Sequence, residues 1–230
     1  MCKISRFSLS SQLIFTAMTV CFISPLSALP KTNKVVHGNV EIETSPNHLK
    51  IKTSDKAIIN YDSFNIGAGQ QVTFIQPKAG SMVLNRVQGN EASNLMGLLN
   101  ANGRVFLINP NGIVIGKTGM INAASFIAST LDIADSDFLN DRFQFSVKPG
   151  TENSSIVHEG MIFCPEGAIG LLAPKIRNEG AILAKAGKVV LVSGEKVTLD
   201  FSGDGLMSFS VEGEVKDALI EHLGTIDAPG

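Results

Sequence analysis

The sequence has 230 residues, of which 44% are hydrophobic, and this is enough for one sizeable packed core. Its formal net charge is −2, and no part of it is both basic and clustered, which argues against nucleic acid as a partner. Two of its three cysteines, Cys2 and Cys21, lie in an N-terminal leader, so Cys164 has no partner for an intrachain disulfide.

Residues 1–28 have the order of a secretory signal peptide. Lys3 and Arg6 precede an uncharged, largely apolar run over residues 7–23, and a stretch of small residues ends the segment. The apolar run is short for a membrane span and no second one follows, so we expect cleavage rather than stable membrane insertion. The expected organisation is a signal peptide followed by one folded domain over residues 29–230.

The stretch LINPNGIVIG (residues 107–116) places a turn between two apolar runs. Asn109, Pro110, Asn111 and Gly112 fit the four positions of a type I β-turn. Proline presets its own φ, the first asparagine can accept a bond from the backbone two residues on, and glycine permits the exit. None of these side chains is a general base or a nucleophile. We therefore expect a stiff corner between the strands RVFLI and IVIG.

The segment over residues 132–150 lacks the glycine rhythm of its surroundings, so we expect it to leave the main fold as an excursion. Within it, RFQFSV (residues 142–147) alternates between polar and apolar residues and predicts a small hairpin. The segment carries a group of four aspartates and one arginine, namely Asp132, Asp135, Asp137, Asp141 and Arg142.

A repeat of about twenty residues follows, and it decides the fold class. IVHEGMIFCPEGAIGLLAPK (residues 156–175) aligns without a gap on IRNEGAILAKAGKVVLVSGE (residues 176–195), and its I-x-[NH]-x-G-x-I signature returns at residues 220–226. The short apolar runs inside each unit have no helical spacing and predict strands. Strands that repeat in register indicate a parallel β-helix, in which equivalent side chains stack from coil to coil.

This fold places particular side chains in the interior. We expect Ile162 over Ile182, Leu171 under Leu191, and Cys164 pointing inward as a small apolar filler. About ten coils, each about 4.8 Å high, would make a rod about 50 Å long.

The fifty residues LNRVQGNEASNLMGLLNANGRVFLINPNGIVIGKTGMINAASFIASTLDI (residues 84–133) closely resemble the secretion domain of filamentous-haemagglutinin-type exoproteins. The resemblance extends from about Val35 to the end of the chain and includes LAPKIRNEGAI and GEKVTLDFSGDG. It implies a right-handed, single-stranded parallel β-helix with a β-capped N-terminal end. It also implies export to the cell surface or medium of a Gram-negative bacterium by a two-partner system.

The resemblance further implies a partner and a site. The partner is an outer-membrane β-barrel transporter that carries POTRA domains and recognises the exoprotein in the periplasm; folding outside the cell is thought to favour export. Carried over by position, the secretion motif comprises Asn109, Pro110, Asn111, Gly112 and Ile113, and Asn85 and Arg86 match the same family block.

Two departures qualify the resemblance. Many members carry an upstream Asn-Pro-Asn-Leu motif, and the corresponding region here reads IQPKAGSMVLNR (residues 75–86), which is nearer the high-molecular-weight-adhesin branch. Such exoproteins also normally continue for many hundreds of residues, so we expect a secretion module of a truncated or split exoprotein, or of one whose effector part lies on another chain. Its last coil would expose an open edge that invites association. A host surface or a downstream exoprotein segment stays open as a further partner.

Two other functions compete with this interpretation. Polysaccharide-cleaving enzymes also use parallel β-helices, and the four aspartates and the arginine named above are the nearest candidates for such a site. Carbohydrate sites usually offer aromatic platforms, however, and the chain has no Trp and one Tyr, Tyr61. A haem or ligand carrier would use histidines, yet the four histidines are scattered and two of them share a coil position with Asn178, which favours a turn role. We expect no catalytic residue, no metal and no cofactor. The four histidines are His37, His48, His158 and His222.

Overall fold

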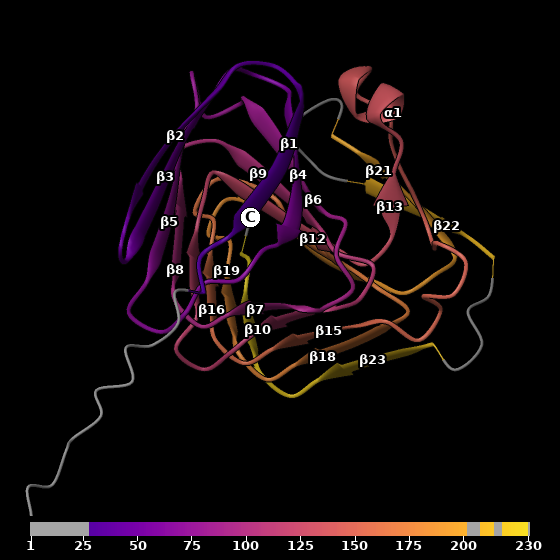
Figure 1. The fold of residues 1–230 in the computed structure, drawn as a ribbon. Helices are drawn as coiled ribbons and strands as arrows, with labels where there is room; N and C mark the ends of the chain where they lie inside the picture. Colours follow the sequence, from indigo (N-terminus) through magenta and orange to yellow (C-terminus); the bar gives the residue numbers. More distant parts are fainter. Residues whose placement is uncertain (1–27, 202–207, 214–217, 230) are drawn as a thin grey trace, which may run out of the picture.

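The computed structural model describes residues 28–201, 208–213 and 218–229 (Figure 1). The predicted signal peptide therefore lies, but for its last residue, outside the described residues. Within the described part, no helix is long and apolar enough to cross a membrane.

Three sheets wind around one core and form a right-handed parallel β-helix, as predicted (Figure 1). Sheet A consists of β1 (Lys31–His37), β4 (Ala57–Ser63), β6 (Met82–Val87), β9 (Arg104–Ile108), β12 (Ser125–Ser129), β17 (Ile169–Leu172) and β20 (Val189–Val192). Sheet B consists of β2 (Val40–Ser45), β3 (His48–Thr53), β5 (Gln71–Ile75), β8 (Leu98–Ala101), β11 (Met120–Asn122), β16 (Met161–Phe163), β19 (Ala181–Leu183) and β24 (Thr225–Asp227). Sheet C consists of β7 (Ser93–Leu95), β10 (Ile113–Ile115), β15 (Ser155–His158), β18 (Lys175–Asn178) and β23 (Leu219–His222).

The interior is filled by ladders of apolar side chains, because every strand turns alternate residues inward. Ile162 pairs with Ile182 and Leu171 with Leu191, so both predicted stacks are confirmed. Cys164 is fully buried in the same core, also as predicted. The expectation of about ten coils was wrong, because the described residues make about six. At about 4.8 Å each, six coils span about 29 Å.

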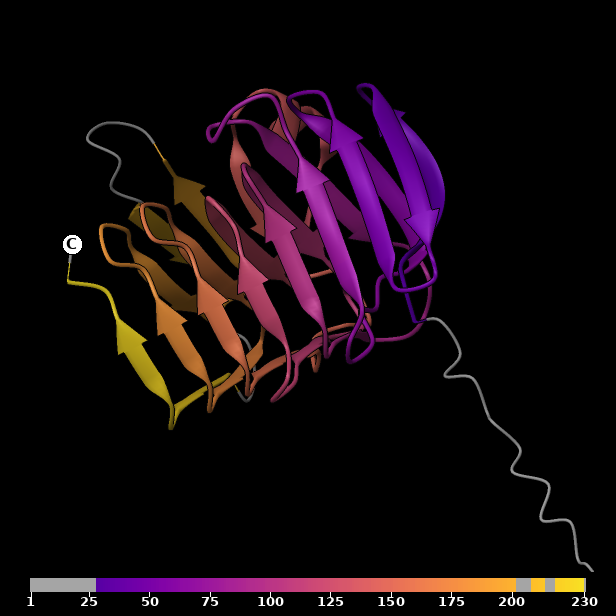
Figure 2. The same ribbon diagram turned by 90° about the vertical axis from the view of Figure 1, so that its left-hand side faces the viewer.

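The N-terminal end of the helix is closed by two antiparallel strands, which confirms the predicted β-cap (Figure 2). β1 pairs antiparallel with β4, and β2 pairs antiparallel with β3, whereas β3 and β4 begin the parallel ladders. Across the β2–β3 hairpin, Lys50 pairs with Glu43 and Lys52 with Glu41, each at 3.2 Å. Charged side chains on the cap's outer strands protect its edges from pairing with other chains.

Stacked glycines explain the glycine of the repeat signature. Gly160, Gly180 and Gly224 lie where the chain turns from sheet C into sheet B. A Cβ on any of them would overlap the backbone carbonyl of a glycine one coil earlier. The backbones approach too closely here for any other residue, so the periodic glycines record coil stacking.

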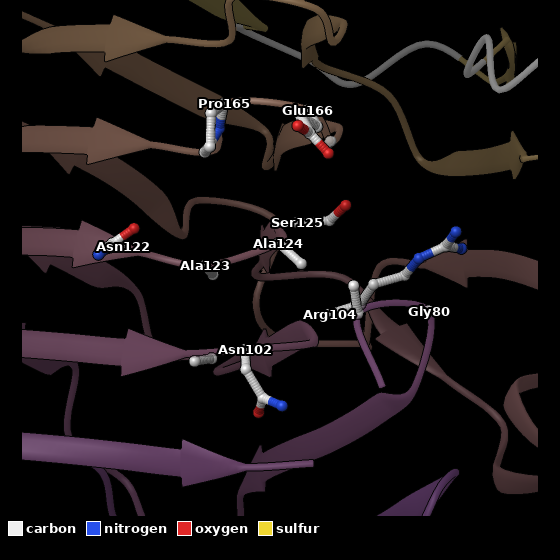
Figure 3. Close-up of a pocket in the computed structure, with 12 residues that line it drawn as sticks. Gly80, Asn102, Arg104, Asn122, Ala123, Ala124, Ser125, Pro165 and Glu166 are labelled. Carbon is white, nitrogen blue, oxygen red and sulfur yellow. The ribbon is translucent and has the colours of Figure 1, made fainter. Parts of the chain in front are cut away.

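The turn from sheet B into sheet A contains a cavity of about 490 Å³ (Figure 3). Longer loops that contain Gly80 and Glu166 enclose it from two sides, and its lining includes Ala101, Ala123 and Ala124.

The predicted excursion is present, and it is larger than expected. β13 (Asp132–Ile133) and β14 (Phe143–Ser146) form its antiparallel pair, and the short helix α1 (Asp135–Leu139), which we did not predict, connects them. Two later strands, β21 (Lys196–Asp200) and β22 (Ser208–Glu212), widen the pair into a four-stranded antiparallel sheet D. Sheet D packs its apolar side on the outer face of sheet A, so a second hydrophobic cluster forms there.

Candidate functional site

The predicted turn connects β9 of sheet A to β10 of sheet C. The amide of Gly112 donates to the carbonyl of Asn109 at 3.1 Å, which closes a four-residue turn. The amide of Asn111 donates to Oδ1 of Asn109 at 3.0 Å, as expected for an asparagine at the first turn position. Gly112 has φ +119°, a conformation that other residues rarely adopt. The local prediction is therefore confirmed.

Asn109 also joins neighbouring coils, which the sequence did not predict. Its side chain is fully buried, and its Nδ2 donates to the carbonyl of Glu91 and to Oγ of Ser93, both at 3.0 Å. Its own amide donates to the carbonyl of Ser129 in the following coil at 3.0 Å. A buried side chain with these bonds stabilises the corner and offers no surface to a partner.

Asn111 is the exposed residue of the turn. Its Nδ2 donates to the carbonyl of Gly89 at 2.8 Å and to Oδ1 of Asn109 at 3.1 Å, whereas its Oδ1 accepts no hydrogen bond from another described residue. Pro110 and Ile113 are buried beside it, Ile113 in the core of the helix. The motif thus divides into buried residues that fix the corner and one asparagine that faces solvent.

Asn85 and Arg86 are neighbours on β6 but point to opposite sides of sheet A. Asn85 points into the core, where it accepts a hydrogen bond from the Tyr61 hydroxyl at 3.0 Å and donates to the carbonyl of Phe106 at 3.1 Å. Burial raises the pKa of Tyr61, so the phenol stays protonated and donates. Asn85 is therefore a structural residue of the core.

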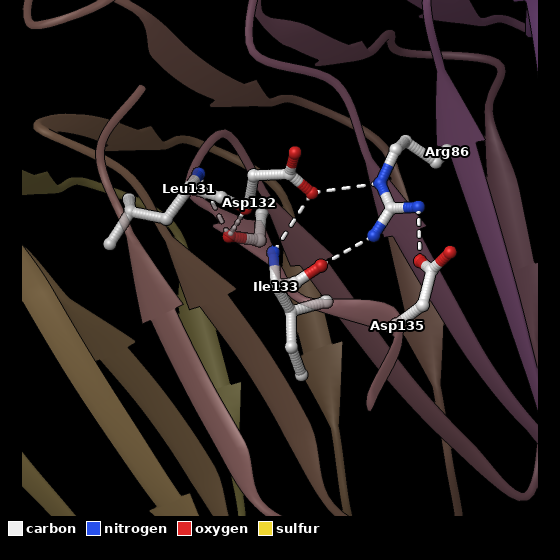
Figure 4. Close-up of polar contacts among 6 residues, drawn as sticks. Arg86, Leu131, Asp132, Ile133 and Asp135 are labelled. Atoms are coloured by element: carbon white, nitrogen blue, oxygen red, sulfur yellow. Dashed lines mark hydrogen bonds and ion pairs between the residues drawn. The ribbon is translucent and has the colours of Figure 1, made fainter. Parts of the chain in front are cut away.

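Arg86 points outward and holds the excursion against the helix (Figure 4). Its Nε donates to Asp132 at 2.8 Å and its Nη1 to Asp135 at 2.6 Å, and Nη2 donates to the carbonyl of Ile133. Burial alone would lower the pKa of Arg86, but the two carboxylates outweigh burial and raise it. Arg86 therefore remains charged and connects β6 to both β13 and α1.

The turn and the Arg86 clamp, by which we mean Arg86 with the carboxylates of Asp132 and Asp135, meet in one groove of about 440 Å³. Pro110 and Asn111 form one part of its lining, and Arg86 and Asp132 form another. Lys148, at the end of the excursion, is exposed and forms no ion pair with another described residue. The structure thus brings Arg86 and the turn together, although they are distant in sequence, and leaves Asn85 apart from them.

The acidic residues of the excursion have structural partners. Besides the two that bind Arg86, Asp137 pairs with Arg142 at 2.8 Å, and Asp141 pairs with Lys56 at 2.7 Å. These carboxylates therefore fasten the excursion through ion pairs.

The histidines at the shared coil position form a polar ladder. Nδ1 of His158 lies 2.7 Å from Oδ1 of Asn178, and Nδ2 of Asn178 lies 2.9 Å from Nδ1 of His222. His48 and His37 are bonded elsewhere, to the Thr73 hydroxyl and to a backbone carbonyl. In the described part of the chain, no group of three or more His, Cys, Asp or Glu residues could hold a metal ion.

The sequence of the chain is similar to a known domain family and to known proteins. The model of the TPS secretion domain matches residues 26–227. A heme/hemopexin-binding protein of Haemophilus influenzae is 32% identical over 231 residues, which cover 97% of this chain and 25% of that protein. A second protein of that name from Haemophilus influenzae is 35% identical over 158 residues, 68% of this chain and 17% of its own length.

A solved structure agrees with these matches. The crystal structure of the HMW1 secretion domain from Haemophilus influenzae superposes with a TM-score of 0.74 at 37% identity and covers 79% of this chain and 48% of that one. The chain spans a quarter or less of the length of these two curated relatives.

Proposed function

The chain belongs to the TPS secretion domain family, and from that premise we propose that it is an N-terminal secretion module whose exposed turn is recognised by a transporter. Membership implies a two-partner-secreted exoprotein of a Gram-negative bacterium and an outer-membrane transporter as its partner. We propose that the POTRA domains of that transporter bind the module in the periplasm, after a signal peptide at residues 1–28 has directed it there and been removed. An adhesin-like or haemagglutinin-like role of the whole exoprotein is part of the same proposal, and no catalytic step is assigned.

The different surroundings of Asn109 and Asn111 within the motif support this proposal. Asn109 is committed to buried bonds within the fold, whereas Asn111 is exposed beside a groove and keeps its Oδ1 free of hydrogen bonds to other described residues. Asn111 lies at this groove, and the excursion that Arg86 fastens supplies its further lining. Hydrogen-bonding side chains around a concave surface provide orientation and specificity for a bound segment. Asn85 supports the site from the core.

Haem or haem-protein binding, which the names of two relatives state for those proteins, has less support here. All four histidines use a ring nitrogen in a hydrogen bond within the chain. An axial haem ligand needs an accessible imidazole nitrogen, and His158 is fully buried.

A secretion assay tests the proposal. The wild-type chain and the variants Asn111→Ala and Asn47→Ala are expressed in a Gram-negative host with and without the cognate transporter. Asn47 is a matched control, because it follows a proline in the exposed β2–β3 turn, which contributes no residue to the lining of the groove. We expect release of the wild type and Asn47→Ala to require the transporter, and release of Asn111→Ala to fall although the variant folds. Release of all three without the transporter would contradict the proposal, and so would equal release of all three with it.

A further inference from the structure

Two residues of the described chain have a left-handed backbone although they are not glycines. They are Lys56, at φ +56°, and Asp141, at φ +57°. Lys56 lies in the tight turn between β3 and β4, and Asp141 is the second residue after α1, a position at which many helices end in glycine. Glycine would suit both backbones better, because a Cβ makes this conformation costly. A property of the two side chains therefore accounts for their presence.

The two side chains contact each other, although 85 positions separate them in the sequence. Nζ of Lys56 donates to Oδ2 of Asp141 at 2.7 Å and to the carbonyl of Leu139, the last residue of α1, at 2.9 Å. We call this contact the latch. It fastens the C-terminal end of α1 to the turn that precedes β4.

The latch holds one end of a short lobe, residues 134–142, which connects β13 to β14 and which we call the lid. Its other end is held by the Arg86 clamp, through Asp135 and the neighbouring Asp132 (Figure 4). Within the lid, α1 has five residues, too few for a helix that is stable alone. The position of the lid therefore depends on these two attachments and on what it packs against.

The lid covers an apolar part of the outer face of sheet A. Phe138 of α1 is fully buried and packs edge to face on Phe106 of β9, with the ring centroids 5.4 Å apart. Ile58 and Met82, on β4 and β6, belong to the same hydrophobic cluster. Removing the lid would expose Phe138 and part of this cluster to solvent without taking apart a coil.

The two attachments differ in strength. The side chain of Arg86 is 12% exposed and donates to three acceptors, whereas the side chains of Lys56 and Asp141 are 28% and 57% exposed. An ion pair that water reaches contributes little to stability and is screened by salt, and a buried one is screened much less. The latch is therefore the end that opens first, and the Arg86 clamp is the hinge.

We propose that residues 134–142 are a salt-sensitive lid, which opens at the latch, turns on the Arg86 clamp and uncovers the apolar surface around Phe106 while the coils stay stacked. Lys56 and Asp141 are positioning residues of this lid, and both keep the charged contact at the cost of an unfavourable backbone. Opening of the lid is a local event with a lower free energy than global unfolding. This inference goes beyond the proposed function and does not depend on a transporter.

Hydrogen exchange of the purified chain, resolved to single residues, tests the lid. The amides of Phe138 and Arg142 report on it, because they donate to carbonyls within the lid at 3.0 Å and 2.8 Å. Lys56→Gly removes the cation of the latch and gives the turn the residue that its backbone favours. We expect both amides to exchange about tenfold faster in this variant, because an ion pair and a hydrogen bond are lost. The free energy of unfolding in urea should stay the same or rise.

A control variant and a salt series sharpen the test. Lys52→Ala removes another ion-paired lysine, which lies on the cap and does not contact the lid, and it should leave the exchange of both amides unchanged. Raising the ionic strength from about 0.01 M to about 1 M shortens the Debye length from about 30 Å to about 3 Å. Salt should therefore speed the exchange of the wild-type lid and leave that of Lys56→Gly unchanged.

Three results would overturn the proposal. The first is equal exchange of the lid amides in the wild type and in Lys56→Gly at low salt. The second is a loss of protection in that variant that spreads equally over the amides of β9 and β12, because Lys56 would then support the coils rather than the lid. The third is an equal response of the two proteins to salt, because the latch would then not be the salt-sensitive contact.

Discussion

Replacing the two asparagines of the turn one at a time should separate stability from recognition. Asn109→Ala removes the bonds that Nδ2 donates to the carbonyl of Glu91 and to Oγ of Ser93, and it removes Oδ1, which accepts from the backbone amide of Asn111. The bond to Ser93 is buried and the other two are partly buried. At about 1 kcal/mol net for each hydrogen bond, the loss is about 3 kcal/mol. Asn111→Ala removes the bonds that Nδ2 of an exposed side chain donates to Gly89 and to Oδ1 of Asn109, and we expect the two together to cost about 1 kcal/mol.

Urea unfolding of the purified chain, followed by circular dichroism, measures both losses. A double-mutant cycle of Asn109→Ala with Ser93→Ala checks the assignment, because the two side chains are bonded at 3.0 Å and their losses should not add. Equal losses for Asn109→Ala and Asn111→Ala would refute the division of roles. So would a pair of fully additive losses for Asn109→Ala and Ser93→Ala.

Three further predictions concern other buried groups. Arg86→Met should lower the free energy of unfolding by about 2 kcal/mol, because it leaves Asp132 and Asp135, both partly exposed, without their cation. An unchanged free energy of unfolding in a urea titration would contradict the role of Arg86 in fastening the excursion. Burial lowers the pKa of His158 below its usual 6.5, so the unfolded chain binds this proton more readily. The contribution of neutral His158 to stability should therefore be full above pH 6.5 and be lost as the pH falls from that value through the lowered pKa. His158→Asn should flatten the dependence of the free energy of unfolding on pH. An equally steep profile in that variant would assign the dependence elsewhere. Burial raises the pKa of Cys164 to about 12, so a thiol reagent should label it at neutral pH only after unfolding, and rapid labelling of the folded chain would contradict this.

The repeat and the turn could be predicted from the sequence because their signals are local or periodic. Ile162 and Ile182 occupy the same place in consecutive units, and stacking of those units fixes the contact between them. The turn follows from its own four residues. The capped end was predicted from the resemblance of residues 84–133 to a known family, because no periodic signal in the sequence marks it.

The remaining features depend on contacts between distant residues. Arg86 meets Asp132 and Asp135 because coil stacking brings β6 beside the excursion, and nothing near Arg86 in the sequence indicates these partners. Sheet D joins β14 to β21, which lies two coils further along the chain. The number of coils was overestimated because these excursions and the cap use residues that the average repeat length had assigned to the rod.

The glycine corner also restricts how proteins of this kind can diverge in length. From Gly160 to Gly180 the chain makes one coil, whereas the intervals from Gly119 to Gly160 and from Gly180 to Gly224 are each about twice as long and contain the strands of sheet D. Yet all of these glycines stack on the same column. We therefore expect insertions and deletions to be tolerated where the chain leaves the helix between sheet A and sheet C. An insertion or deletion that moves one of these glycines out of the stacked column by one residue should not be tolerated. In relatives of different length, gaps should gather in the excursions and avoid the glycine corner.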